Sequence, residues 1–463
     1  MMRWIWLCLG FSVVLSAADR PNVLLIMSDD LAAMLGSYGH PQAKTPHLDA
    51  LAKEGVVFSR AYCQFPHCNP SRSSMMTGLR PNTTRVTNNE DNLYHNLPGV
   101  MTMPHWFRQN GYATARCGKI FHLGVPSGLE SMDDPQGWDF GTEFKSELPY
   151  PKKRESAVKI KSGKKQGLTW QEIPQDDEAL VDGAFAKTAI EWLDERDKSK
   201  PFFLAVGFHR PHLPLVAPAK YFDLYPFDSI PLPEAPADDE ADIPLPARNG
   251  AVPGYALTAT PDQRRAAIRA YLACVSYVDA QAGKLLGALK ECGLSDNTII
   301  VFASDHGWHL GEHGLWHKRS LFEESARVPL IIRAPGTKAR GVTPSFAGLV
   351  DVFPTLCELT GVTAPPKLEG KSLAPILIDL STQVQDHAFT QARRGQNAEH
   401  WGRSVRTARW RCNEWNEGRD GIELYDHDAD PHEYTNLAND TEHADVLKEL
   451  RALLAAKLPP IQR

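Results

Sequence analysis

The sequence lacks an excess of positive charge, and this argues against one large class of function. Its 463 residues include 50 lysines and arginines against 56 aspartates and glutamates, a formal net charge of −6. An extended nucleic-acid surface needs a basic excess. We therefore expect no nucleic-acid partner, and any anionic ligand must be held by positive groups gathered locally.

Cysteines are few and irregularly spaced. They stand at positions 8, 63, 68, 117, 274, 292, 357 and 412 without a CxxC pair, so neither a zinc-ribbon nor a thioredoxin-type motif is present. Cys8 falls in the N-terminal segment described next, which leaves an odd number in the rest of the chain. In an exported protein, an odd number points to one cysteine with a special role, while the others pair or are buried.

Long apolar runs are also missing, with one exception at the N-terminus. Arg3 precedes the apolar run Trp4–Val14, and the small residues Ser16–Ala18 follow. This order is typical of a secretory signal peptide, here residues 1–18. A membrane anchor is the alternative, but a span requires about 20 apolar residues, more than this run contains. The sequence thus predicts a secreted or periplasmic protein with no stable membrane anchor.

Buried strands alternate with helices through most of the chain. The unbroken apolar run in Asn22–Asp30 suits a strand buried on both faces, and the runs before His209 and Asp305 are of the same kind. Helical patterns separate them, and the longest begins at Thr260 and ends at Gly293. We therefore predict an α/β fold with a large, mixed, mostly parallel sheet sandwiched by helices.

The pattern changes in the C-terminal part of the sequence. After about Gln383, stretches typical of antiparallel hairpins lead into a final helical segment. We predict a main domain of residues 19–383 and a small α+β subdomain of residues 384–463, built from an antiparallel sheet plus a helix. A proline- and acid-rich loop, about 226–254, interrupts the main domain, and loops of this length are commonly functional or mobile.

Polar side chains follow three of the predicted strands. The three pairs are Asp29 with Asp30, His209 with His212, and Asp305 with His306. Open α/β sheets bind their ligands at the carboxyl ends of strands. One such pair alone would be more typical of a helix cap or a surface turn, but three at one edge of a sheet indicate a shared site.

The acidic members of these pairs suggest a divalent metal. Asp29, Asp30 and Asp305 offer hard carboxylate oxygens, which suit calcium or magnesium. His306 complicates the choice, because imidazole favours manganese, iron or zinc. Calcium is our preferred interpretation, with magnesium or manganese as alternatives.

The stretch CNPSRSSMMTG, Cys68–Gly78, places a cysteine directly before a Pro-Ser-Arg turn. Pro70 suits the first turn of a helix, so Cys68 is expected at a helix N-terminus, where Arg72 and the helix dipole favour an anion. On this pattern alone the cysteine could be a disulfide partner, a buried small side chain, a thiol nucleophile or a chemically modified residue.

Five motifs in order give the chain a resemblance to a known family. They are SDD at Ser28–Asp30, CNPSR at Cys68–Arg72, GKIFH at Gly118–His122, FHRPHLP at Phe208–Pro214 and SDHGWHLGEHGLWHK at Ser304–Lys318. With these motifs the chain resembles the type I, formylglycine-dependent sulfatases of the alkaline phosphatase superfamily, and within them the iduronate 2-sulfatase branch. The resemblance covers nearly the whole mature chain.

The resemblance implies a cofactor made from the protein itself. In this family a dedicated formylglycine-generating enzyme, which reads C-x-P-x-R, oxidises the cysteine to Cα-formylglycine during export. The hydrate of that aldehyde is a gem-diol, one oxygen of which attacks sulfur while the second later drives sulfate out. The implied metal ligands are Asp29, Asp30, Cys68 (as formylglycine), Asp305 and His306.

The resemblance also assigns roles to other residues. The implied catalytic residues are Cys68, Arg72, Lys119, His122, His212 and Lys318. The metal, Arg72 and the two lysines would hold charge on the sulfuryl oxygens. His212 would protonate the leaving sugar oxygen, with Lys318 as its helper or rival, and His122 would be the partner of the diol.

Several of these residues have structural alternatives. Lys119 and Lys318 could be solvated surface lysines, and His122 could be a core histidine. Trp316 could stack on a sugar ring, alongside substrate contacts from Lys318 and His212, or could pack in the core. Three further histidines near Asp305 are tempting as metal ligands but are expected to be loop or substrate-contact residues: His309, His313 and His317.

The expected activity is hydrolysis of O-sulfate esters in a sulfated polysaccharide or oligosaccharide, with the 2-O-sulfate of a uronic acid as the best single guess. Arg85, Arg393 or Arg394 could clamp the carboxylate of such a substrate. Two alternatives remain. His306 stands where many sulfatases have asparagine, which leaves a formylglycine-dependent phosphonate or phosphate diester hydrolase open. The other is a non-catalytic glycan-binding sulfatase homologue.

Overall fold

An eight-stranded sheet forms the centre of the computed structural model, which describes residues 20–122, 133–142, 155–156, 168–248, 259–395 and 397–461. Its strands are β1 (Asn22–Asp29), β2 (Val56–Tyr62), β3 (Ala113–Gly118), β4 (Phe140–Gly141), β7 (Phe202–Pro211), β9 (Thr298–Ser304), β12 (Leu330–Arg333) and β13 (Gly341–Gly348). They lie in the order β13-β2-β12-β9-β1-β7-β3-β4, and β12 runs antiparallel to both of its neighbours while the other pairs are parallel. The predicted mixed, mostly parallel sheet is confirmed.

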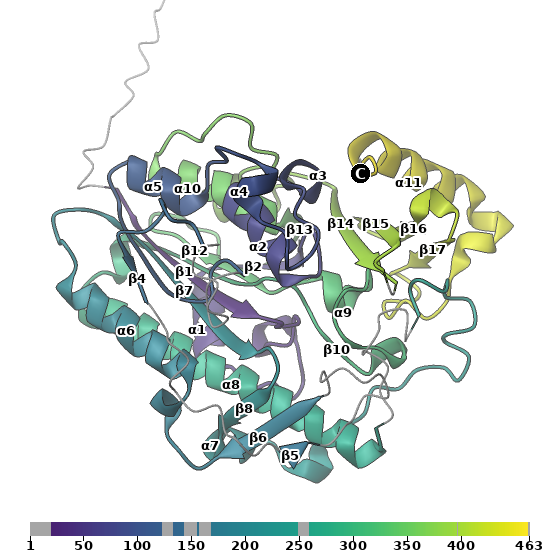
Figure 1. Cartoon of the computed structure of the whole chain (residues 1–463), viewed down its shortest axis with the longest axis horizontal. Coiled ribbons are helices and arrows are strands. Elements are labelled where there is room, and N and C mark those ends of the chain that lie inside the picture. Colours follow the sequence, from purple (N-terminus) through teal and green to yellow (C-terminus); the bar gives the residue numbers. More distant parts are fainter. Residues whose placement is uncertain are drawn as a thin grey trace, which may run out of the picture.

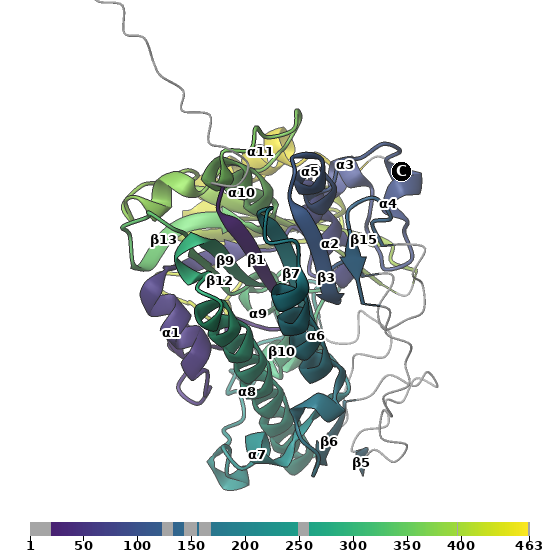
Figure 2. The ribbon, with the colours of Figure 1, turned by 90° about the vertical axis from the view of Figure 1, so that its left-hand side faces the viewer.

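Helices cover both faces of this sheet (Figures 1 and 2). On one face lie α1 (Pro46–Glu54), α6 (Val181–Glu195) and α8 (Pro261–Glu291), and on the other lie α2 (Cys68–Thr77), α5 (Met103–Gln109) and α10 (Val352–Thr360). Strand side chains alternate between the two layers. In β1, Leu24 and Ile26 pack into one core cluster, whereas Val23, Leu25 and Met27 pack into the other. Burial on both faces explains the unbroken apolar run of this strand.

The longest helix has the ends that the sequence predicts. Thr260 and Gln263 form a capping box at the start of α8, and Pro261 occupies the first turn. Within α8, the buried Asp279 accepts hydrogen bonds from the backbone N–H groups of His47 and Leu48 at 3.3 and 2.7 Å. This carboxylate therefore caps the neighbouring helix α1 and fixes it against α8.

The C-terminal part forms a separate antiparallel sheet. It consists of β14 (His387–Arg394), β15 (His400–Thr407), β16 (Trp410–Trp415) and β17 (Gly421–Asp426), in that order, with α11 (Ala444–Lys457) packed on it. The predicted antiparallel subdomain with a helix is confirmed, although the sequence did not reveal β14. The exact boundary between residues 383 and 384 stays a prediction.

Smaller elements complete the described structure. They are α3 (Pro81–Thr84), α4 (Leu93–Asn96), α7 (Ala219–Phe222), α9 (Glu323–Ala326), the strands β5 (Glu155–Ser156), β6 (Thr169–Ile173) and β8 (Leu215–Pro218), and the pair β10 (His309–Leu310) and β11 (Trp316–His317). Within the described ranges no helix is long and apolar enough to cross a membrane. The predicted signal peptide, residues 1–18, lies outside the described residues.

A buried charge network joins the C-terminal sheet to the main domain. Arg411 of β16 is fully buried and donates hydrogen bonds to Glu433 and to Glu323 of α9. His427 lies 2.9 Å from the same Glu433 oxygen, and Tyr62 of β2 donates to Glu323 at 2.8 Å. Arg411 thus bridges the buried Glu433 and the partly buried Glu323, and Arg406, 3.2 Å from Glu323, adds a second guanidinium at this junction.

Replacing Arg411 with methionine should therefore destabilise the protein by about 3–5 kcal/mol, because the buried Glu433 loses the guanidinium that pairs with it. The measurement is denaturant unfolding followed by tryptophan fluorescence. The matched control is Arg409→Met, since the Arg409 side chain is 51% exposed where it pairs with Asp426. An exposed pair contributes less than about 1 kcal/mol. Equal losses in the two variants would contradict this role for Arg411.

The same network predicts sensitivity to acid. Burial acts to raise the pKa of Glu433, but Arg411 overrides it and the pKa falls to about 2. A pKa below the unfolded value gives a stabilisation that is complete above the unfolded pKa and is lost as pH falls through the folded one. We expect the melting temperature to drop between about pH 4 and pH 2, and to drop less steeply in Arg411→Met. Parallel curves for the two proteins would refute the assignment.

Candidate active site

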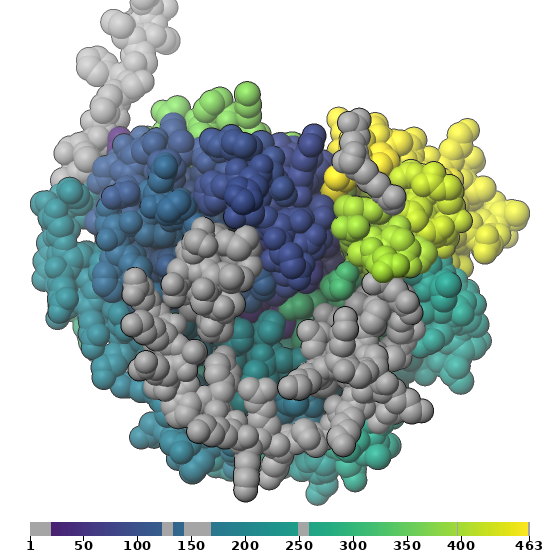
Figure 3. Space-filling view, in the orientation of Figure 1, coloured from purple at the N-terminus to yellow at the C-terminus, as the bar shows by residue number. Residues whose placement is uncertain are grey.

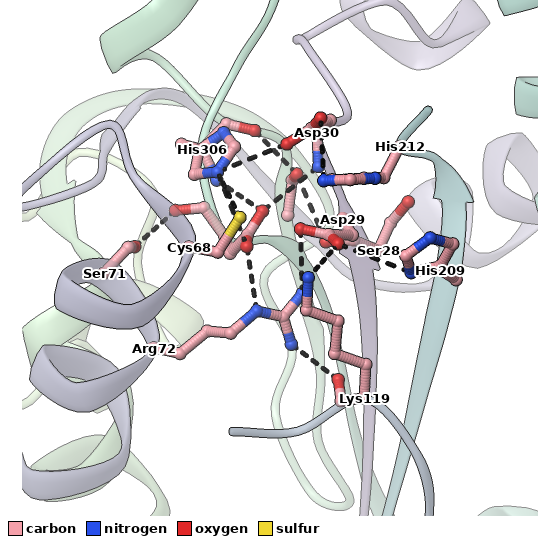
Figure 4. A network of polar contacts seen from close by, with 12 residues as sticks. Ser28, Asp29, Asp30, Cys68, Ser71, Arg72, Lys119, His209, His212 and His306 are labelled. Atoms are coloured by element: carbon pink, nitrogen blue, oxygen red, sulfur yellow. Dashed lines mark hydrogen bonds and ion pairs between the residues drawn. The ribbon is translucent and has the colours of Figure 1, made fainter. Parts of the chain in front are cut away.

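The three predicted polar clusters meet at one edge of the central sheet. β1 is paired in parallel with β7 on one side and β9 on the other, with Ser28 opposite Ser304. Asp29 ends β1 and Asp30 follows it, while Asp305 and His306 follow β9. The turn before α2 brings Cys68 to the same edge (Figure 4).

Cys68 is the first residue of α2 and is fully buried. Its Sγ lies 3.2 Å from Nζ of Lys318 and 3.4 Å from Nε2 of His306. Burial and the Asp29 carboxylate act to raise the pKa of this thiol, but Lys119 and the other nearby positive groups hold it well below its usual range. The position therefore stabilises negative charge on whatever group residue 68 carries.

Arg72, one turn further along α2, is fully buried and bridges two carboxylates. Its Nε donates to Oδ2 of Asp305 at 2.8 Å, and a terminal nitrogen lies 3.4 Å from Oδ1 of Asp29. The guanidinium also donates to the carbonyls of Lys119 and Ile120. In this arrangement Arg72 orients the carboxylates and the Lys119 segment, and its contact with sulfuryl oxygens stays a prediction.

The two lysines are buried in the site. Lys119 is 3% exposed and pairs with Oδ2 of Asp29, while Lys318 is 7% exposed and pairs with Oδ1 of Asp30. The surface-lysine alternative is therefore wrong for both. His122 is half-buried, and burial lowers its pKa while the neighbouring Cys68 opposes the shift. Its Nδ1 is buried and has no hydrogen-bond partner among the described residues.

The donor set fits a divalent cation. Ligand atoms of Asp29, Cys68, Asp305 and His306 all lie within 4.8 Å of one another, and all four residues are buried. Burial raises the pKa of Asp30 to about 8 and that of Asp305 to about 6. Oδ1 of Asp29 and Oδ2 of Asp30 are buried without a hydrogen-bond partner in the described structure. Buried carboxylate oxygens with no donor are what a cation of the calcium class takes as ligands.

His212 approaches this cluster from the end of β7. Its Nε2 is 3.9 Å from Oδ2 of Asp30, and its Nδ1 lies 2.7 Å from the carbonyl of Leu213, to which it donates in the neutral ring. Its ring centroid is 4.7 Å from that of His209, whose Nδ1 is 3.8 Å from Oδ2 of Asp29. The side chain of His212 is 28% exposed, so it alone of these two histidines is open to a substrate.

A buried carboxylate holds the turn that carries His212. Asp182, in the first turn of α6, accepts hydrogen bonds from the backbone N–H groups of His209 and Arg210 at 2.7 and 3.0 Å. Asp182 is fully buried, and Ser28 of β1 donates to the carbonyl of Arg210 at 2.7 Å. The path of the chain into His212 is thus fixed by α6 and β1 together.

We expect Asp182→Asn to lower kcat by about 10–100-fold. The asparagine side chain has a single acceptor oxygen, so it cannot accept from both backbone N–H groups that the carboxylate holds. The turn that carries His212 should then shift. The measurement is steady-state kinetics beside thermal unfolding. Asp177→Asn is the control, since the Asp177 carboxylate accepts instead from Lys220 and Lys284, at 2.7 and 2.9 Å. Loss of stability without loss of kcat in both variants would show that Asp182 is merely structural.

The histidines of the loop after β9 do not join the metal cluster. His309 lies 2.6 Å from the Ser320 hydroxyl, and His313 lies 3.2 Å from Asp239. The His317 ring meets Trp308 edge-on at 4.8 Å. His309 and His317 lie in the short strands β10 and β11, and His313 lies in the turn between them, so the expected loop position is wrong for two of the three. Trp316 is 4% exposed in the core cluster beside α8, so the structure favours packing over sugar stacking for this residue.

Some residues that shape the site gave no sequence signal. Tyr271 of α8 donates to the carbonyl of Asp30 at 2.7 Å and accepts from the N–H of Ala32 at 2.9 Å. It lies on an apolar helix face, where a tyrosine is typical of an ordinary residue of the hydrophobic core. Ser304 accepts from the N–H of Leu31 at 2.9 Å. Asp182 could have been suspected only as an acid in the first turn of a helix.

Comparison with known proteins identifies the fold and the site together. A model of the sulfatase family matches residues 21–362, which contain every predicted catalytic and metal-ligating residue. The chain belongs to the sulfatase family. It is a sulfuric ester hydrolase built on an alkaline phosphatase-superfamily fold. A second model, described as the C-terminal part of N-sulphoglucosamine sulphohydrolase, matches residues 311–458.

Named sulfatases resemble the chain over nearly its whole length. A sulfatase of Formosa agariphila is 35% identical over 94% of this chain and 86% of that protein. Iduronate 2-sulfatase of Mus musculus is 31% identical over 96% of this chain and 98% of that protein. Among solved structures, the phosphonate monoester hydrolase of Agrobacterium radiobacter matches with a TM-score of 0.78 and 27% identity, covering 94% and 95% of the two chains. Sulfatases of this family generally use formylglycine and a divalent metal, and the residues described above fit both.

Proposed function

We propose that this sulfatase is exported and removes the 2-O-sulfate of a uronic acid in a sulfated glycan, with Cys68 converted to formylglycine and calcium as its metal. The observation that carries the proposal is the placement of Cys68 at the N-terminus of α2, within 3.2–3.4 Å of Lys318 and His306. The similarity to iduronate 2-sulfatase supports the choice of substrate. The apolar run at the N-terminus supports export, where the modifying enzyme would meet the chain.

Two absent groups supply the reactive chemistry. As formylglycine, residue 68 supplies a hydrated aldehyde, with an oxygen nucleophile where Sγ lies in the unmodified chain. A divalent cation would be held by Asp29, Asp305 and His306, whose ligand atoms cluster with that of Cys68, and by the adjacent Asp30, and it would supply Lewis acidity to the reaction. The remaining steps depend on the buried bases and cations of this chain.

Lys119 and Lys318 place positive charge on two sides of residue 68, where charge on the sulfuryl oxygens develops. Their pairing with Asp29 and Asp30 keeps them in place before substrate binds. Burial lowers the pKa of His122 and so favours its neutral form, which would act as the base for the second hydroxyl of a hydrated formylglycine at residue 68. Loss of that proton would let the C–O bond to the transferred sulfate break, with release of sulfate, as the aldehyde forms again.

His212 is the group that protonates the leaving sugar oxygen. Burial, acting with Lys318, lowers the pKa of His212, while the nearby Asp29 opposes that shift. An incoming sulfate monoester adds negative charge beside the ring and so favours its protonated form. Because Nδ1 is engaged by the Leu213 carbonyl, the proton to be donated resides on Nε2, which faces the site.

The experiment compares three substrates on converted, calcium-loaded protein: 4-nitrophenyl sulfate, a 2-O-sulfated uronate disaccharide prepared from heparin, and a 6-O-sulfated glucosamine disaccharide. The proposal expects the 2-O-sulfated disaccharide to have a kcat/KM at least about 100-fold above that of the 6-O-sulfated one. Faster release of 6-O-sulfate would overturn the uronate assignment while leaving the sulfatase intact.

A phosphonate substrate is the second candidate. His306 follows the metal-binding Asp305, and the Agrobacterium radiobacter phosphonate monoester hydrolase has a closely similar fold. Turnover of 4-nitrophenyl phenylphosphonate faster than 4-nitrophenyl sulfate by the same preparation would favour this alternative.

A further inference from the structure

A second cavity lies in the C-terminal subdomain, away from Cys68. Its volume is about 190 Å³, and Gln391, Trp401, Asn416 and Arg419 contribute to its wall. The chain end closes one side of it through Pro460 and Ile461. The mechanism above uses none of these residues.

Two buried polar atoms in this wall lack partners. Gln391 is 2% exposed, and its Oε1 accepts no hydrogen bond in the described structure. The indole Nε1–H of Trp401 is likewise buried and donates to no described group. Buried polar atoms are almost always satisfied, so an unpaired acceptor and an unpaired donor in one cavity indicate a missing polar ligand. A sugar ring offers hydroxyls that both donate and accept.

The cavity is also suited to an anionic sugar. The Arg419 side chain is 71% exposed and pairs with Glu417 at 2.7 Å. The guanidinium of Arg393 lies 4.7 Å from the ring centroid of Trp401. An exposed cation and an aromatic ring together recognise the charged and the apolar faces of a uronate or a sulfated sugar. The cavity is lined by two arginines, Arg403 and Arg419, and by one glutamate, Glu417, so its lining carries a net positive charge that favours an anion.

A hydrogen bond links the strand beside this cavity to the chain segment that follows Lys318. Lys318, beside Cys68, is followed by Arg319, which donates to the carbonyl of Arg393 at 2.7 Å. Arg393 is paired with Trp401 across β14 and β15. Figure 1 shows these two strands on the side of the subdomain nearest the main domain. The segment that follows Lys318 thus contacts the strand that carries Gln391, and a glycan that spans both sites would pass this contact.

We infer that the Gln391–Trp401–Arg419 cavity is a distal subsite that binds an uncleaved anionic sugar unit of the same glycan chain. The inference rests on the proposed action on a sulfated glycan. The subsite makes the enzyme prefer oligosaccharides over disaccharides, because only the longer glycan reaches Trp401. The subsite contributes to binding and takes no part in the chemistry at residue 68.

The test measures binding, so it does not depend on turnover. Cys68→Ala protein is titrated by calorimetry with a heparin-derived disaccharide and a heparin-derived hexasaccharide at fixed calcium. We expect the hexasaccharide to bind more tightly. The ratio of the two affinities should fall about 10-fold when Trp401→Ala or Gln391→Leu is added, the size of one lost sugar contact.

Trp410→Ala is the matched control. Trp410 is a half-buried tryptophan of the same sheet, and Arg409 lies 4.6 Å from its ring, but it is not part of the cavity wall. The control should leave the affinity ratio unchanged. Equal ratios in the Trp401 and Trp410 variants, or hexasaccharide and disaccharide affinities that are equal in the parent, would overturn the subsite. Failure to hydrolyse any sulfate ester by converted wild-type protein would instead refute the proposed function.

Discussion

Alanine in place of Cys68 is expected to abolish turnover of every sulfate ester, by about 10⁵-fold, the order seen when an enzyme loses its covalent nucleophile. The α2 N-terminus and its positive neighbours would remain, but no group at residue 68 could attack sulfur. Turnover of 4-nitrophenyl sulfate by variant and parent, purified from the same modifying host, measures the effect.

Cys68→Ser is the more informative variant. A serine can accept sulfate but has no second hydroxyl to expel it, so we expect release of at most one equivalent of nitrophenol.

Cys63→Ala is the control for these variants. Cys63 is also fully buried and lies on the same segment, but its Sγ donates to the Ser325 carbonyl, at 3.9 Å, and no role at the reacting position is assigned to it. It should retain the parental turnover. Multiple turnovers by Cys68→Ser at a rate near that of the parent would contradict the requirement for a hydrated aldehyde.

Stripping the divalent cation is expected to lower kcat by about 10³-fold, since a metal Lewis acid supplies several kcal/mol of transition-state stabilisation. The protein is dialysed against a chelator, its metal content is determined by mass spectrometry, and calcium, magnesium or manganese is then restored. Calcium should recover most of the activity. It should also raise the melting temperature of the stripped protein, because a ligand that binds only the folded state stabilises it.

Asp305→Asn provides the variant for this test, with Asp279→Asn as its match. Both carboxylates are buried, but Asp279 caps α1 and is not one of the residues that could hold the metal. The Asp305 variant should lose the calcium-dependent rise in melting temperature, and the Asp279 variant should keep it. A stripped protein that retains full activity, or a rise that persists in Asp305→Asn, would contradict the metal site.

The strands that build the site were predictable because burial on both faces leaves a strong pattern. The apolar runs that end at Asp29 and Asp305 predicted two buried strands of one mostly parallel sheet, and in the fold these strands pair directly in parallel. Pro70 and Arg72 predicted the start of α2 beside Cys68, and that helix begins at Cys68. These features are local in sequence, so composition and spacing are sufficient to predict them.

Features that depend on tertiary packing were not predictable. From the sequence alone, Lys119 and Lys318 could lie at the surface or in the site, and only the fold places each against an aspartate. Tyr271 and Asp182 act through backbone groups more than 25 residues away in the chain, and no local pattern signals such a contact. The substrate-stacking role of Trp316 was suggested by its position in a motif, but packing against α8 covers the ring.

The most direct test of the account is the mass of the tryptic peptide Ala61–Arg72 after alkylation, on protein isolated from its own export route. This peptide carries both Cys63 and Cys68, so Cys63 serves as an internal standard. The account predicts a single alkylated cysteine and a mass lowered by the difference between CH₂SH and CHO at residue 68. A peptide alkylated at both cysteines, from protein that still turns over sulfate esters, would contradict it.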